Sequence, residues 1–247
     1  MSRMKRILAE SKTAFRTFLR RRTAVVFTFL FPLILVIIFG ALISTDPGGG
    51  GLFAEPPEYY LAGYIAVVVL FTPMSRMSAE VIRHRKDNRY EKLATTPLTQ
   101  AEWFVAHTIV TTLLVLIASV LIVALLVAFG NTPLPRSPII PLFIVFGVVV
   151  FAGIGAFLGR VAQTQDGAIA ASNTIALPML FLAETFVPPE FLPDWFRPIV
   201  ELMPLTPFTR GVRATMFGDP WGLNLMILGV LAVVFFVVGY RSLPQAD

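Results

Sequence analysis

Apolar residues in this chain gather in six long runs that are separated by polar segments. The run from Thr23 to Ile43 contains no charged residue. An apolar run of about 20 residues is long enough, as a helix, to cross the hydrocarbon core of a bilayer. Because nothing in that core hydrogen-bonds a free backbone, such runs must be helical. The pattern predicts an all-α integral membrane protein with six spans, at residues 23–43, 60–79, 104–129, 139–158, 168–187 and 221–240.

The segments that join these spans alternate between many and few basic residues. Residues 1–22 hold eight Lys and Arg and a single acid, whereas residues 44–58 hold three acids and no Lys or Arg. The loop after the second span is again densely basic, and the loop 130–138 has only Arg136. Cytoplasmic loops carry the excess of Lys and Arg, so we expect the N-terminus in the cytoplasm. An even number of spans then places the C-terminus there too.

Composition supports the membrane class and narrows the partners. Hydrophobic residues make up 56% and charged residues 14% of the chain, against about 25% charged residues in soluble domains. The formal charge of +5 resides in loops beside apolar runs, so we expect a lipid bilayer and no nucleic acid as a partner. Cysteine is absent, which excludes disulfides and thiolate metal sites.

Residues 4–19 predict an amphipathic helix before the first span. At about 100° per residue, apolar side chains including Phe15 fall on one side, and Arg16 and Arg20 fall on the other. A basic amphipathic helix next to a span lies in the headgroup plane. It is either an orientation anchor or an elbow that passes force from a cytoplasmic partner to the first span.

The loop 80–102 carries charges of both signs. It also contains patterns that end and begin helices, which a loop that only fixes the orientation in the membrane would not need. A helix is expected to stop before Pro97, and Thr99-Gln100-Ala101-Glu102 matches a capping box that opens the third span. The pattern predicts a short helix across the cytoplasmic face. Docking of a second protein and a solvated charged loop are the two interpretations. Within this loop, His84 is expected to be solvated.

Residues 183–218 are too apolar for a free loop and too rich in proline to span a membrane. They predict two short helices that dip into the outer leaflet, the second starting at Thr206-Pro207 and ending at Gly218. Glu184 lies at the start of this segment. An acid near a membrane is a candidate substrate or gate residue. At the outer interface, however, the same acid is tolerated at little cost.

Two further patterns concern packing and the membrane interface. Gly155-x-x-x-Gly159 in the fourth span permits close approach of another helix, either within this chain or in a second subunit. Aromatic residues close to the span ends are expected at the membrane–water interfaces. They are Tyr59, Tyr60, Trp103, Trp221 and Tyr240.

Two motifs make the chain resemble a known family, the membrane subunit of type-2 ATP-binding-cassette (ABC) exporters. The first is Glu91-x-Leu93-x-x-Thr96-Pro97-Leu98-Thr99, which is similar to the family's Glu-x-Leu-x-x-Thr-Pro-Leu-Ser. The second follows the family's order and spacing before the sixth span, with Phe186-x-Pro188, Leu192-Pro193-x-Trp195, Pro204-Leu205-Thr206 and Arg213.

The sequence departs from the family pattern at three places. Asn88-Arg89 stand where the family has Gly-Thr, and Met203 replaces the Asn before Pro204. Ala183-Glu184 stand where a Gly is usual near the end of the fifth span, and side chains at these positions limit how closely another backbone segment can approach.

The resemblance covers essentially the whole chain and implies one transmembrane domain, residues 1–247. It implies an interfacial helix at 1–22, six spans, a coupling helix within 80–102 and a re-entrant helical pair within 188–218. The ATPase-coupling residues would be Arg85, Asp87, Glu91, Leu93, Thr96, Pro97 and Leu98. The outer re-entrant or gate residues would be Glu184, Phe186, Pro188, Pro193, Trp195, Pro204 and Arg213, and the interfacial-helix residues Phe15, Arg16 and Arg20.

The resemblance also implies partners. Two permease subunits, identical or different, would assemble in the cell membrane with two nucleotide-binding ATPase subunits. The chain contains no phosphate-loop motif, and its two histidines form no metal-ligand cluster in the sequence. We therefore expect no cofactor on this chain and no enzyme activity of its own, with ATP and Mg²⁺ held by the ATPase.

The expected function is the permease of an ABC exporter that moves a drug, lipid or glycan by alternating access. The alternative is a stand-alone secondary transporter or channel, which would need ionisable residues within the membrane as a proton or ion relay. The spans hold few, namely Arg76, Glu80 and Glu184. A membrane enzyme would need a His, Asp or Glu constellation at one interface, and the sequence offers none with credible spacing.

Overall fold

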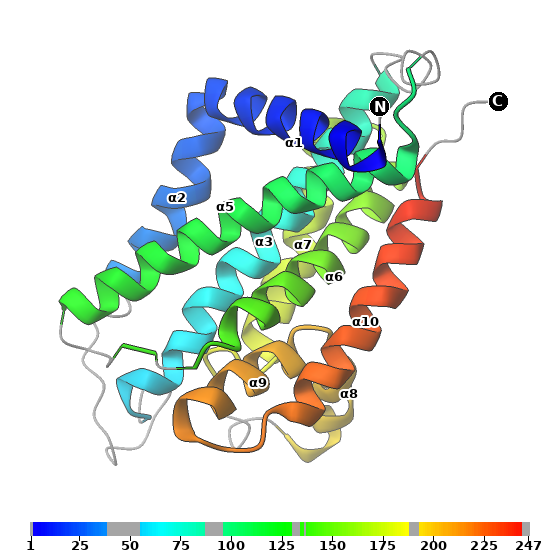
Figure 1. Ribbon diagram of the computed structural model, residues 1–247. Coiled ribbons are helices and arrows are strands. Elements are labelled where there is room, and N and C mark those ends of the chain that lie inside the picture. Colours follow the sequence, from blue (N-terminus) through cyan, green and yellow to red (C-terminus); the bar gives the residue numbers. More distant parts are fainter. Residues whose placement is uncertain are drawn as a thin grey trace.

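The structure is a computed structural model that describes residues 2–38, 55–86, 96–129, 134–135, 137–187 and 193–243. Within these ranges its regular secondary structure is all helical, without a strand, as the apolar runs predict. Its elements (Figure 1) are α1 (Arg3–Arg20), α2 (Arg22–Val36), α3 (Pro57–Lys86), α5 (Gln100–Ala128), α6 (Ile140–Val161), α7 (Gln165–Leu182), the 3₁₀ turn η3 (Asp194–Phe196), α8 (Arg197–Leu202), α9 (Thr206–Phe217) and α10 (Gly222–Arg241).

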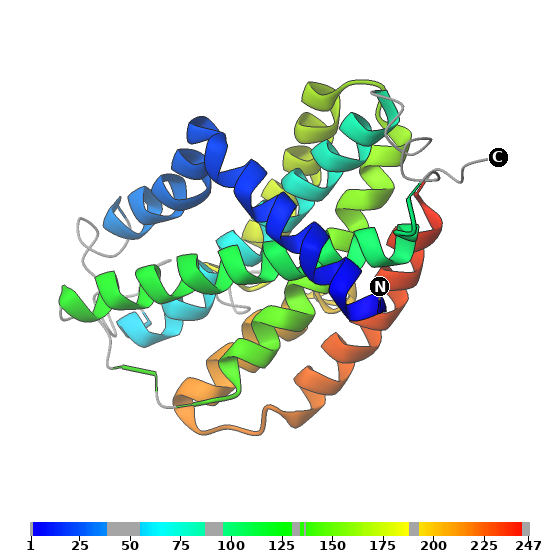
Figure 2. The ribbon, with the colours of Figure 1, turned by 45° about the horizontal axis from the view of Figure 1, so that its top comes forward.

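The long helices form a bundle with two different ends. Helix α1 lies across α5 at one end, where α10 also finishes, and Figure 2 shows the same crossing from above. The short helices α8 and α9 cover the opposite end (Figure 1). We name these the α1 end and the α9 end.

Each predicted span overlaps a helix, but the helices differ in length and polarity. Helix α7 ends at Leu182, so residues 183–187 of the predicted span 168–187 are not helical. Among the described residues, α3, α5, α6 and α10 are long and apolar enough to cross a membrane. Helix α2 is described as far as Val36, and the remainder of the predicted span 23–43 lies largely outside the described residues. Helix α7 has 18 residues, and its first turn is polar because it holds Gln165 and Asp166.

Helices α3 and α6 approach each other closely through glycines. A Cβ atom on Gly155 would lie 2.5 Å from the backbone oxygen of Met74, and one on Gly159 would lie 2.7 Å from that of Ser78. Real Cβ atoms do not come this close, so only glycine permits this spacing. The Gly-x-x-x-Gly pattern therefore serves packing within the chain, which confirms that interpretation over a contact between subunits.

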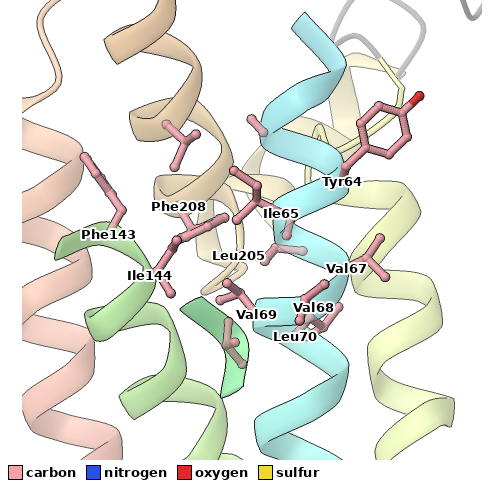
Figure 3. Close-up of a cluster of buried hydrophobic side chains, with 14 of the residues drawn as sticks. Tyr64, Ile65, Val67, Val68, Val69, Leu70, Phe143, Ile144, Leu205 and Phe208 are labelled. Atoms are coloured by element: carbon pink, nitrogen blue, oxygen red, sulfur yellow. The ribbon is translucent and has the colours of Figure 1, made fainter. Parts of the chain in front are cut away.

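A cluster of buried apolar side chains fills the part of the bundle that lies beside α9. Figure 3 shows Ile65 and Val69 of α3, Ile144 of α6 and Phe208 of α9 meeting there, and all four are buried. Helix α9 is thus part of the core, although its sequence is too short to span a membrane. Gly218 ends it with φ of 80°, the left-handed conformation that glycine adopts without strain, as predicted.

The structure corrects three predictions made from the sequence. Helix α3 continues to Lys86, so residues 80–86 belong to the second span's helix rather than to a loop. His84 is consequently buried in the last turns of α3, and the prediction of a solvated side chain was wrong. Tyr59, Tyr60 and Trp103 are also buried inside the bundle, with 9%, 2% and 0% of their surfaces exposed, so they do not face the membrane–water boundary as predicted.

Candidate functional site

At the α1 end, helix α1 is attached to α5 by a charged pair. Arg6 Nε donates to Glu102 Oε2 at 2.9 Å, and its Nη2 donates to Oε1 at 2.5 Å. These bonds raise the pKa of Arg6. Glu102 also completes the predicted capping box, because its backbone N–H donates to Thr99 Oγ1 and its carboxylate accepts from the Thr99 N–H. One carboxylate therefore fixes both the start of α5 and the position of α1.

A second polar pair joins the same two helices one turn further along. His107 Nε2 lies 3.3 Å from Glu10 Oε1, and this hydrogen bond lowers the pKa of Glu10. Further along both helices, Ala14 and Phe18 of α1 pack against Val110 and Leu114 of α5. Polar and apolar contacts along α1 together bind it to α5 as one unit.

The end of α3 joins this unit through a buried indole. Trp103 Nε1 donates to His84 Nε2 at 3.1 Å. Because an indole nitrogen only donates, Nε2 accepts and the proton of His84 lies on Nδ1, which donates to the backbone oxygen of Glu80 at 3.0 Å. The Trp103 ring also lies 4.3 Å from that of His107. Adjacent rings thus connect α3 to α5, and His107, the last of them, bonds Glu10 of α1.

The predicted coupling residues do not all lie at one surface. Arg85 donates to the backbone oxygens of Arg160, at 2.6 Å, and of Ala162, so it closes the end of α6 within the chain. Thr96 and Pro97 are exposed, and Leu98 packs partly against the cluster around Trp103. The remaining coupling residues, Asp87, Glu91 and Leu93, lie outside the described residues.

The predicted residues of the interfacial helix divide between its two faces as expected. Phe15 packs against the apolar contact between α1 and α5. Arg16 and Arg20 are exposed. These two basic side chains therefore lie on the exposed face of α1, as expected for an interfacial helix.

At the α9 end, Glu184 follows α7 in a left-handed conformation, with φ of 54°. Its carboxylate accepts from Arg210 Nε at 2.8 Å and from Nη2 at 2.6 Å. Its backbone oxygen accepts from Arg213 Nη2 at 2.7 Å, and the neighbouring Ala183 oxygen accepts from Thr209 Oγ1 at 3.0 Å. Glu184 thus keeps a backbone shape that favours glycine, and α9 holds it there.

The other predicted outer residues are arranged around this turn or away from it. The Arg213 guanidinium lies 3.6 Å from the centre of the Tyr59 ring, and burial lowers the pKa of Arg213. Phe186 packs edge-on against Tyr64. Three others lie elsewhere in the segment: Trp195 is 73% exposed, Pro193 precedes η3 and Pro204 lies in the turn before α9. Pro188 lies outside the described residues.

A cavity of about 930 Å³ lies between α2, α3 and α7, and the residues at the end of α1 close one side of it. Sequence reasoning missed it. Its only signal was a set of polar residues at intervals of three or four along α3, which share one face of a helix. The α3 residues that line it are Val67, Val68, Phe71, Thr72, Ser75, Arg76, Ala79, Glu80 and Arg83.

The sequence of this chain matches a known protein family over most of its length. Residues 6–217, from α1 to the end of α9, match the model of a family described as ABC-2 type transporter. The chain belongs to the ABC-2 type transporter family. This match includes both ends of the bundle and the cavity, and it confirms the resemblance drawn from the two sequence motifs.

Three named permeases are similar to most of this ABC-2 chain. The daunorubicin resistance ABC transporter permease protein DrrB1 of Streptomyces coeruleorubidus is 28% identical over 221 residues, which are 83% of this chain and 74% of that protein. The putative transport permease ycf38 of Porphyra purpurea is 25% identical over 205 residues, 81% and 69% of the two chains. The inner membrane transport permease YhhJ of Escherichia coli K12 is 26% identical over 195 residues, 74% and 52% of the two chains.

Proposed function

We propose that this chain is the permease subunit of an ATP-driven exporter in the cell membrane. In the proposed complex, two permease subunits, identical or different, work with two ATPase subunits that carry ATP and Mg²⁺. The family match and the printed names of the relatives, which are permeases, support this proposal. The proposed topology has six spans with both termini in the cytoplasm, so the α1 end faces the cytoplasm and the α9 end faces outward.

The observation that carries the proposal is the junction of α1, α3 and α5 at the α1 end. An ATPase that docks on residues 83–98 and on α1 would meet the part of the molecule where three helices are tied by Arg6–Glu102, Glu10–His107 and His84–Trp103. Closure of the ATPase dimer would move this junction as a body. Rigid-body movement between two states is a recurring form of transmission in proteins.

The proposed cargo path includes the cavity between α2, α3 and α7. Movement of the junction would tilt α3 and the start of α2 and so change the access of the cavity from inward to outward. The cargo is of the drug, lipid or glycan class, and DrrB1, which is named for daunorubicin resistance, illustrates the drug class. The proposed direction is outward.

Co-purification with a candidate ATPase tests the proposal. The chain is expressed together with a candidate phosphate-loop ATPase from the same organism, and only the permease carries the affinity tag. We expect the ATPase to be retained and its hydrolysis rate to depend on the permease. A permease that is recovered without any ATPase, and that moves cargo by itself, would instead be a secondary transporter or channel.

A matched pair of variants makes the test specific for the junction. Arg6→Gln removes the guanidinium that joins α1 to Glu102, whereas Arg3→Gln removes the same charge from an exposed position of α1. We expect Arg6→Gln to lower transport per ATP hydrolysed while Arg3→Gln does not. Equal transport in the two variants would show that the junction does not carry force.

A further inference from the structure

The cavity between α2, α3 and α7 changes character along its length. Along α3, the lining side chains nearer the α9 end are apolar, with Val67, Val68 and Phe71. Those nearer the α1 end are Arg76, Glu80 and Arg83, with Thr72 and Ser75 between the two groups. The cavity therefore has an apolar end and a charged end.

Helices α2 and α7 repeat this division. Helix α7 contributes Leu177, Asn173, Ile169 and Gln165, four residues spaced by one helical turn and ending in an amide near the α1 end. On the other wall, Phe31 and Pro32 of α2 face the apolar end and Arg21, which precedes α2, lies at the charged end. Phe31 and Leu177 are 44% and 49% exposed, so the apolar end opens between α2 and α7 at the surface of the bundle.

The charged end holds more positive than negative groups. Its described lining includes three arginines, Arg21, Arg76 and Arg83, and one carboxylate, Glu80. Glu80 is already engaged, because Oε1 pairs with Arg83 Nη2 and lies 3.7 Å from Arg21 Nη1, and Oε2 lies 4.0 Å from His84 Nδ1. One carboxylate cannot balance the charges of Arg21, Arg76 and Arg83 together, so the charged end keeps a net positive charge.

Arg76 has donor groups that nothing among the described residues satisfies. Its Nε and Nη2 atoms are buried and make no hydrogen bond there, and the same holds for Nε of Arg83. The Arg76 guanidinium lies 5.0 Å from the centre of the Phe18 ring of α1, which holds it in place but accepts no strong hydrogen bond. A buried guanidinium without an acceptor is costly, and a phosphate or carboxylate is the partner whose geometry matches it.

We propose that the cavity binds an amphiphilic anion, with a phosphate or carboxylate head at Arg76 and Arg83 and an apolar chain along Val67, Phe71 and Leu177. This inference rests on the proposed function, because it names the class of cargo that the same cavity takes. An anionic lipid or lipid-linked molecule from the inner leaflet has this form. A small soluble anion would fill only the charged end.

Binding of labelled lipids to the detergent-solubilised complex of permease and ATPase tests the inference. The probes are short-chain phosphatidic acid and phosphatidylcholine with the same fluorescent chain, followed by anisotropy, with inorganic phosphate as competitor. We expect the phosphatidic acid to bind about tenfold more tightly than the phosphatidylcholine, as one lost charged hydrogen-bond pair implies. Inorganic phosphate at the same concentration should not displace it.

Three variants locate the site. Arg76→Gln removes the unsatisfied guanidinium and should abolish the preference for phosphatidic acid. Asn173→Asp adds a carboxylate to the lining with almost no change of shape, and it should weaken the same probe even if Arg76→Gln does not fold. Lys12→Gln removes a charge from the exposed face of α1, outside the cavity, and should leave both affinities as in the wild type.

The outcomes separate this inference from the proposed function. Equal affinity for the two lipids in a complex that retains its ATPase overturns the inference alone. Displacement of the lipid by inorganic phosphate overturns the amphiphile and identifies a small anion as the ligand. Binding that disappears in Arg76→Gln and Asn173→Asp supports the inference whether or not the ATPase is retained, since the permease alone carries the cavity.

Discussion

Arg6 of α1 holds Glu102 of α5 with two nitrogens of one guanidinium, although the two residues lie 96 positions apart in the chain. The same carboxylate caps α5 through Thr99. Movement of α1 must therefore either carry the start of α5 with it or break both hydrogen bonds between Arg6 and Glu102. This relationship underlies the first prediction.

Arg6→Gln should uncouple ATP hydrolysis from transport. The amide cannot reproduce the two-pronged charged contact, so α1 can shift without α5, and we expect transport per ATP to fall roughly threefold to tenfold. Parallel measurement of cargo and phosphate release in vesicles provides the ratio. An unchanged ratio in Arg6→Gln, with Arg3→Gln also unchanged, would contradict the role of this contact.

Acid should release α1 from α5 through Glu10. The hydrogen bond from His107 holds the pKa of Glu10 below the ordinary carboxyl value of 4.5, so the contribution of the pair is complete above that pH and disappears as the pH falls through the lowered pKa. Hydrogen exchange of α1 amides, followed from about pH 6 to about pH 3 after correction for the intrinsic rates, should show loss of protection at the acid end. Glu10→Gln should be less protected at neutral pH and should lack this acid transition.

Arg210→Gln should destabilise the α9 end. Glu184 is buried, with 5% of its side chain exposed, and the variant leaves its carboxylate without the two Arg210 bonds. Because Arg210 is itself 39% exposed, we expect a loss of roughly 1–2 kcal/mol. Thermal unfolding in detergent measures it. Arg197→Gln breaks the exposed pair with Asp194 and is the matched control, in which little change is expected.

Replacement of Glu184 separates the backbone from the ion pair. Both Glu184→Ala and Glu184→Gly lose the carboxylate, but only alanine keeps a Cβ at φ of 54°. Alanine should therefore be less stable than glycine by about 1 kcal/mol. Equal stability would mean that the left-handed conformation is not retained. Export that is unchanged in Glu184→Ala would remove Glu184 from the list of gate residues.

Alanine at Gly155 should force α3 and α6 apart. The added Cβ would meet the Met74 oxygen at 2.5 Å, a backbone atom that moves only with its helix. We expect a loss of about 1–3 kcal/mol, as for other overpacked cores. Gly222→Ala is the control, since a Cβ there meets nothing within 4 Å. A stable Gly155→Ala variant would contradict the close packing of these helices.

The sequence predicted those features that depend on neighbours in the chain. The capping box at Thr99 and Glu102, the amphipathic helix before the first span and the glycine end of α9 all follow from spacing within one or two turns. The apolar runs likewise predicted the helices, because length and hydropathy decide whether a segment enters a bilayer.

The sequence could not show which polar residues find partners across the fold. Residues 80–86 were interpreted as a loop because they are charged, yet Glu80 binds Arg83 and His84 accepts from Trp103, so their polarity is satisfied inside the bundle. Likewise Glu184 could not be assigned a partner, because Arg210 reaches it only once α9 folds back onto the end of α7. The cavity required the positions of three helices at once.

Transport in vesicles that contain the complex, with ATP hydrolysis present or blocked, tests the central claim most directly. The blocked complex carries an ATPase whose catalytic carboxylate has been replaced, so that nucleotide binds without turnover. We predict that the chain moves cargo only while ATP is hydrolysed by its partner. Cargo movement at the same rate in vesicles that hold this chain alone would contradict the account.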